Sequence, residues 1–247
     1  MRHLAISLVA IGAVYTLVPW IITRILGIGV FRKGEETREI ALTFDDGPNP
    51  LYTPQLLDML KRHEVKATFF VLGVRAQQYP DLILRMHREG HQIGLHNYLH
   101  KSNWLMLPWT VRKEVERCAA QIQDITGEHP TCYRPPWGIF NVFDLLLRRD
   151  YTFVLWSLMA KDWRSRVGQK NLKSVLLHQI TDGSVVLLHD CGETLGADKD
   201  APLYMLRALE DVLHDLHSRD IRCVRIDEMT RTVSSENKHE KHLSIRS

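Results

Sequence analysis

Short apolar strands alternate with helical segments from Glu39 to Ile226, and this alternation restricts the chain to an α/β fold. Strands are predicted at 39–44, 67–72, 91–95, 133–134, 152–156, 184–188 and 222–226. Helices are predicted at 53–63, 80–89, 108–126, 142–149, 171–181 and 201–217. Seven strands separated by helices, without a linker or an internal repeat, predict one domain whose parallel strands form a complete or incomplete barrel.

Polar residues follow five of the predicted strands, at the point where each strand ends. These groups are Asp45-Asp46-Gly47-Pro48, His96 to His100, Arg134 to Gly138, Asp162-Trp163 and His189-Asp190. Each group alone has an ordinary explanation, such as a turn or a pair of surface histidines. Because catalytic groups in such folds lie beyond the carboxyl ends of the strands, the five groups together predict one active site.

The residue types indicate metal-assisted hydrolysis. Two histidines four residues apart, His96 and His100, can bind one cation, and a carboxylate can supply a third ligand while a position stays open for water. Neighbouring side chains of an extended chain point in opposite directions, so one of Asp45 and Asp46 can bind the metal while the other acts as a base. His189, on another strand, can protonate a leaving group, which completes the machinery for cleaving an amide or an ester.

The motifs resemble those of the polysaccharide deacetylases of carbohydrate esterase family 4, the NodB-homology domain. The most specific is Thr43-Phe44-Asp45-Asp46-Gly47-Pro48, and the His96/His100 pair, Arg134-Pro135-Pro136-Trp137-Gly138 and Leu187-Leu188-His189-Asp190 follow in the family's order. The resemblance covers about residues 39–226. It implies a distorted, incomplete (β/α) barrel of about seven parallel strands.

The resemblance also implies a role for each motif residue. Asp46, His96 and His100 would bind a divalent metal, which we expect to be Zn²⁺, with Co²⁺, Ni²⁺ and Mn²⁺ as alternatives. Asp45 would be the general base, and Arg134 would orient it and keep it ionised.

On the opposite side of the site, His189 would be the general acid, paired with Asp162. The backbone N–H of Trp137 would stabilise the oxyanion together with the metal. The residues implied in substrate binding are Pro136, Trp137, Trp163 and Leu187.

The implied reaction is hydrolysis of N-acetyl groups on N-acetylglucosamine-type glycans, such as peptidoglycan or chitin oligosaccharides, with release of acetate. A carbohydrate O-acetyl esterase and a catalytically silent, membrane-tethered glycan-binding protein are the alternatives. Three departures from the family pattern concern the substrate rather than the chemistry: Asn97 after the first histidine, Trp137 as the aromatic residue, and Leu158-Met159-Ala160 upstream of Asp162.

An uncharged run of twenty residues, Leu4–Thr23, is long enough for a helix to span about 30 Å of hydrocarbon. It predicts a membrane anchor within a separate segment 1–38, with a cleaved signal peptide or a buried core helix as alternatives. The basic residues after the run favour a cytoplasmic C-terminal side, whereas the family resemblance favours a catalytic domain outside the cytoplasm. We expect a single-pass membrane protein with an extracytoplasmic catalytic domain.

The net charge of +3 belongs to the ends of the chain, because residues 39–230 contain 23 basic and 25 acidic residues. This balance gives no reason to expect a nucleic-acid partner, and we expect a monomer. The segment 231–247 is polar and lacks periodicity, which predicts a disordered tail. Of the four cysteines, Cys191 lies near His189 and is a candidate thiol nucleophile or, more simply, a small spectator residue.

Overall fold

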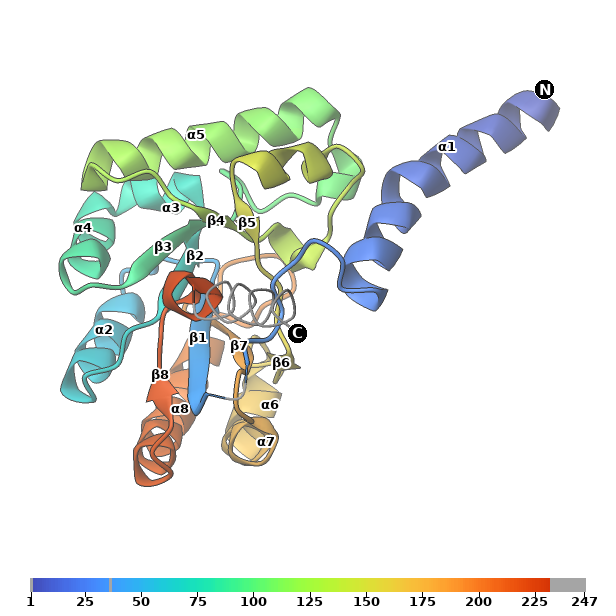
Figure 1. Cartoon of the computed structure of the whole chain (residues 1–247). Helices are drawn as coiled ribbons and strands as arrows, with labels where there is room; N and C mark the ends of the chain where they lie inside the picture. Colours follow the sequence, from blue (N-terminus) through green and yellow to red (C-terminus); the bar gives the residue numbers. More distant parts are fainter. Residues whose placement is uncertain (1, 36, 232–247) are drawn as a thin grey trace, which may run out of the picture.

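A curled sheet of parallel strands surrounded by helices forms the body of this computed structural model, which describes residues 2–35 and 37–231 (Figure 1). The strands are β1 (Glu39–Asp45), β2 (Thr68–Val71), β3 (Gln92–Leu95), β4 (Cys132–Tyr133), β5 (Thr152–Phe153), β6 (Leu158–Met159), β7 (Val185–His189) and β8 (Arg222–Cys223). The α-helices are α1 (Arg2–Trp20), α2 (Thr53–Arg62), α3 (Gly73–Gln78), α4 (Pro80–Arg88), α5 (Pro108–Thr126), α6 (Ser165–Lys170), α7 (Leu172–Gln179) and α8 (Ala201–Ser218).

The strand order confirms the predicted incomplete barrel. Seven strands are hydrogen-bonded in the order β5-β4-β3-β2-β1-β7-β6, and β8 pairs with the start of β1. The paired strands are parallel throughout this sheet. β5 and β6 are the two ends of the order, so the sheet curls without closing.

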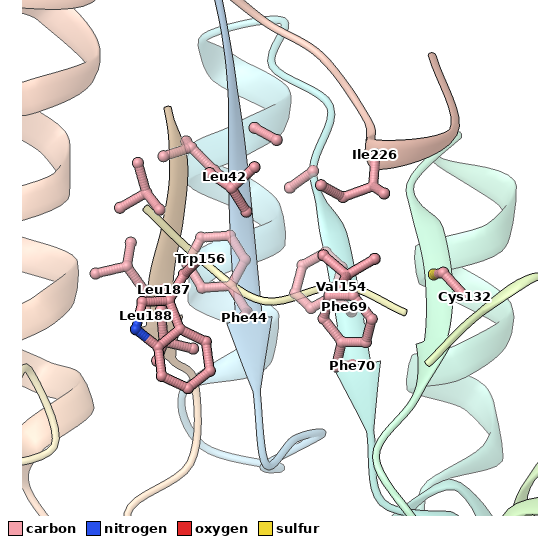
Figure 2. Packing of buried hydrophobic residues seen from close by; sticks show 14 of the residues in the cluster. Leu42, Phe44, Phe69, Phe70, Cys132, Val154, Trp156, Leu187, Leu188 and Ile226 are labelled. Carbon is pink, nitrogen blue, oxygen red and sulfur yellow. The ribbon is translucent and has the colours of Figure 1, made fainter. Parts of the chain in front are cut away.

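β1 is the central strand, and all seven of its residues are buried. β2 and β7 flank it, with Thr43 opposite Thr68 and Asp45 opposite His189. On the face of the sheet opposite to the Asp45 side chain, the rings of Phe44 and Phe69 stack with their centroids 5.2 Å apart (Figure 2). Apolar contact on both faces explains why the central strands have nearly continuous hydrophobic sequences.

The predicted strand 152–156 ends at Phe153, because its neighbour β4 is followed by two prolines, which have no N–H to donate. Beyond that point the strand pairs with a different partner. The Phe31 N–H donates to the Phe153 carbonyl at 2.7 Å, and the Leu155 N–H donates to the Phe31 carbonyl at 2.8 Å. The N-terminal segment therefore lies alongside the open edge of the barrel.

The α-helix predicted at 142–149 is wrong in type, since residues Asp144–Arg149 form a 3₁₀ helix. Asn141 precedes it, and its side-chain oxygen accepts from the backbone N–H groups of Phe143 and Asp144. The Asp144 carboxylate accepts from the Asn141 N–H at 2.7 Å. These side-chain bonds compete with an α-helical start and favour a tight turn.

The apolar N-terminal run is divided between α1, which contains Pro19 in its last turn, and a π-helical turn, η1 (Ile21–Ile25). Within residues 2–35 and 37–231, no helix combines the length and the apolar character that crossing a membrane requires. The predicted membrane span is therefore not confirmed. The tail predicted at 231–247 lies, apart from Arg231, outside the described residues.

Candidate active site

Side chains from the carboxyl ends of β1, β3 and β7 converge on one cleft of about 340 Å³. Asp45 is the last residue of β1 and His189 is the last residue of β7. His96 and His100 follow β3 in a loop. The polar groups that the sequence placed at strand ends are thus brought together, as the parallel topology requires.

Asp46, His96 and His100 form a group that can hold a metal ion. The Asp46 Oδ1 atom lies 3.3 Å from His96 Nε2 and 3.2 Å from His100 Nε2. This oxygen is buried and has no hydrogen-bond partner among the described residues. An unsatisfied carboxylate oxygen facing two imidazole nitrogens is the donor set of a divalent cation such as zinc, so the residues fit a metal.

The protonation of these residues suits a metal site. The His96 Nδ1–H donates to the Arg134 carbonyl at 2.6 Å, which leaves Nε2 as the nitrogen that can bind a metal. Burial lowers the pKa of His100 to about 4, so its imidazole is neutral at pH 7. Burial opposes ionisation of Asp46, but the adjacent imidazoles of His96 and His100, together with His189, outweigh it and hold the pKa of Asp46 well below its usual value.

Asp46 and Gly47 make a sharp turn after β1. Asp46 has a left-handed backbone with φ of 74°, which aspartate tolerates better than most residues. A Cβ atom at Gly47 would lie 2.3 Å from the Asp190 carboxylate. Only glycine allows this close approach, and the turn separates the directions of the Asp45 and Asp46 side chains.

Asp45 is held from behind by Arg134, which is fully buried. The Arg134 Nη1 donates to Asp45 Oδ1 at 2.6 Å and to Thr43 Oγ1 at 2.9 Å. Its other nitrogens donate to the carbonyls of Val154 and Leu155. The guanidinium is therefore fixed by several bonds, and it holds the Asp45 carboxylate in one orientation.

His189 and Asp162 form the second pair, as the sequence predicted. His189 Nδ1 lies 2.9 Å from Asp162 Oδ1. The His189 backbone N–H donates to the other carboxylate oxygen, Asp162 Oδ2, at 2.6 Å. Burial alone would lower the pKa of His189, but Asp162 and then Asp46 and Asp45 outweigh it and raise this pKa to about 9. His189 is therefore protonated at pH 7, with Nε2 not engaged by Asp162.

The remaining predicted substrate residues do not all reach the cleft. Trp137, Trp163 and Leu187 line it, whereas Pro136 is buried and is not among the lining residues. Trp137 has φ of 57° within the turn Pro136–Gly138 (η3). Its ring contacts the His100 ring edge-on, with the two ring centroids 4.3 Å apart.

Several residues that line the cleft were not predicted from the sequence. Thr194 donates to Asp46 Oδ2 at 2.6 Å from the loop after β7, a position that the strand-end rule could have indicated. Trp156 and Arg24 also line the cleft. Arg24 belongs to the segment interpreted as an anchor, where no sequence signal distinguishes a catalytic-site residue.

Two further groups do not fit a catalytic role. Burial raises the pKa of Cys191 to about 12, which argues against the thiol nucleophile. His63, Glu210 and His214 also lie close enough to share a cation. Glu210, however, already pairs with Arg62 at 2.7 Å and with His63 at 2.9 Å, so its oxygens are satisfied.

The architecture and the site define a class of protein. It is an incomplete parallel barrel with an Asp-His-His group that can hold a metal, flanked by one aspartate–arginine pair and one histidine–aspartate pair. Residues 32–153 match the family model described as polysaccharide deacetylase. The chain belongs to the polysaccharide deacetylase family.

Individual relatives agree with this assignment. The chain is 39% identical over 176 residues to the peptidoglycan-N-acetylglucosamine deacetylase PgdA of Listeria monocytogenes. The aligned region covers 71% of this chain but only 37% of PgdA, so the chain spans little more than a third of that relative's length. It is 34% identical over 204 residues to a peptidoglycan-N-acetylglucosamine deacetylase of Bacillus cereus, covering 78% of this chain and 88% of that protein. The crystal structure of the Bc1960 peptidoglycan N-acetylglucosamine deacetylase superposes with a TM-score of 0.74 at 29% identity, covering 84% of this chain and 95% of that one.

Proposed function

We propose that the protein hydrolyses N-acetyl groups on N-acetylglucosamine-type glycans, such as peptidoglycan or chitin oligosaccharides, and releases acetate and a free amine. The observation that carries this proposal is the unsatisfied Asp46 Oδ1 facing His96 and His100 between two charged pairs. The names of the relatives support the choice of substrate.

We propose Zn²⁺ as the metal, because two imidazoles and one carboxylate with an open position are the ligand set of catalytic zinc sites, and Co²⁺, Ni²⁺ and Mn²⁺ as substitutes. When bound by Asp46, His96 and His100, the cation supplies Lewis acidity to the water and the acetyl oxygen. The protein's own groups supply the proton transfers.

Asp45, oriented by Arg134, accepts a proton from the attacking water as the new C–O bond forms. The backbone N–H of Trp137 donates to the oxygen on which negative charge develops. The protonated His189 then gives its proton to the sugar nitrogen as the C–N bond breaks. Leu187, Trp163 and Trp137 form the apolar walls in which the acetyl methyl group can lie.

Acetate release from chitin tetramer and from peptidoglycan tests this proposal directly with the full chain. We expect release with zinc, loss of release after chelation, and recovery when zinc is returned. Release from O-acetylated but not N-acetylated glycans would instead favour the esterase alternative. Zinc binding without release from any of them would contradict hydrolysis and favour a silent glycan-binding protein.

We also propose that the N-terminal segment attaches the protein to a membrane, with the catalytic body outside the cytoplasm. α1 projects from the body (Figure 1) and exposes apolar side chains such as Val9 and Ile11. Membrane fractions that release the protein only in detergent, with the body open to external protease, would support this placement. A protease-protected body would contradict it.

Finally, we propose that the protein acts as a monomer, because residues of one chain supply the whole described site. Light scattering at the mass of one chain would support this, and twice that mass would contradict it.

A further inference from the structure

Arg24 reaches the active-site cleft from outside the barrel. It lies in η1, directly after α1, yet it lines the same cleft as Asp46 and His189. Its guanidinium carbon lies 4.3 Å from the centre of the Trp156 ring, and Trp156 also lines the cleft. An arginine stacked on an indole face keeps its planar donors in a fixed orientation.

Hydrogen bonds hold the segment that carries Arg24 against the body. The Phe31 backbone pairs with Phe153 and Leu155, next to Trp156. The side chain of Arg32 donates back to the Arg24 carbonyl at 2.9 Å, which closes the loop between them. Figure 1 shows the chain running from the end of α1 along the body toward β1. The position of Arg24 is therefore built into the fold.

Arg24 has no ionic partner in the described part of the chain, where no carboxylate lies within ion-pair distance of its guanidinium. Burial and the nearby charges of Arg32 and Arg134 lower the pKa of Arg24, and both of these neighbours are cationic. The acidic groups of the cleft are engaged elsewhere, since Arg134 holds Asp45 and the metal-binding group contains Asp46. The surroundings of Arg24 therefore favour an anion.

We propose that Arg24 is a specificity-determining residue that binds a carboxylate or phosphate group carried by the glycan beside the N-acetyl group to be hydrolysed. This inference rests on the proposed function. A planar guanidinium can bind either anion through two parallel hydrogen bonds. The family match begins at residue 32, so Arg24 lies outside the matched segment.

The test compares glycans that differ only in charge, using the zinc-loaded full chain. The first pair is an N-acetylglucosamine–N-acetylmuramic acid disaccharide, which carries a lactyl carboxylate, and its methyl ester. The second pair is chitobiose 1-phosphate and chitobiose. The wild-type protein should prefer the charged member of at least one pair in kcat/KM. The carboxylate pair and the phosphate pair separate the two sources of negative charge.

Arg24→Gln should lower that preference about 10- to 100-fold, mainly through KM, because it removes a charge-assisted hydrogen bond. Arg24→Lys should keep part of the preference, since it retains the charge without the planar pair of donors. The matched control is Arg164→Gln, a cleft-lining arginine that already faces Asp198 at 3.6 Å, and it should change the preference less than about twofold. Zinc content and melting temperature establish that each variant is folded.

If the wild type releases acetate without preferring a charged glycan, the proposed role of Arg24 is wrong. The same holds if the wild type and Arg24→Gln show an equal preference. Either result leaves the proposed deacetylase function standing. No acetate from any of the four glycans would overturn the proposed function and, with it, this inference.

Discussion

Asp45 and His189 are register partners at the carboxyl ends of the neighbouring parallel strands β1 and β7. The carboxylate and the imidazole that we assign as base and acid therefore enter the cleft side by side. Each is held from behind by one partner, Arg134 for Asp45 and Asp162 for His189. Replacing these partners tests the two roles while the base and the acid themselves stay in place.

Asp162→Asn should move the alkaline limb of the pH profile toward neutral pH. A general acid must be protonated, so the wild-type rate should stay high below the pKa of His189, about 9, and fall as pH rises through it. Without the Asp162 charge this pKa should fall toward the ordinary value of about 6.5, so that most activity is lost by pH 8. The measurement is kcat against pH from 5 to 10.

The control for this shift is Asp211→Asn, which removes an exposed carboxylate that pairs with Lys173 on the outer helices. Its alkaline limb should coincide with that of the wild type. An unchanged limb in Asp162→Asn would show that His189 is not the group whose protonation limits the rate.

Arg134→Met should destabilise the fold strongly, because it leaves the buried Asp45 carboxylate unpaired. Removing one partner of a buried ion pair costs about 3–5 kcal/mol of unfolding free energy. Arg112→Met is the matched control, since Arg112 pairs with Glu116 on the exposed face of α5 and should cost less than about 1 kcal/mol. Urea unfolding at pH 7 measures both, and equal losses would contradict the described role of Arg134.

Asn97→Ala should weaken zinc binding, although Asn97 is no ligand. Asn97 has a left-handed backbone with φ of 63°, and its side chain bonds to Asn103 and to the Tyr133 hydroxyl, each at 2.8 Å. This buried network braces the loop that carries both histidines. Mutating a residue that supports a metal ligand typically lowers the metal affinity 10- to 100-fold.

Tyr133→Phe removes the hydroxyl on the other side of the same bond and should change zinc affinity in the same direction. Competition with a chromophoric chelator measures both variants. Wild-type affinity in both would mean that the loop keeps its geometry without the network.

The parallel barrel and most of its active site could be predicted because both follow from local patterns. The apolar sequence of β1 and the polar residues directly after it are adjacent in the chain, and parallel strands place such ends at one edge. The roles implied for Asp45 and His189 agree with their positions, and both remain predictions until they are tested.

Other features depend on contacts that the local sequence does not show. α3 and α6 have six residues each, too few for a helical period to stand out, and β6 has two. Arg24 could not be predicted because its place in the cleft depends on Phe31 pairing with β5, which lies more than a hundred residues away in the chain.

The zinc content and the acetate release of Asp45→Asn and Asp46→Asn test the central claim most directly. The account predicts that Asp45→Asn binds zinc like the wild type and releases no acetate, because it keeps the metal ligands and loses only the base. Asp46→Asn should lose zinc and activity together. Loss of zinc in Asp45→Asn, or near wild-type acetate release from it, would contradict the division of roles between the two aspartates.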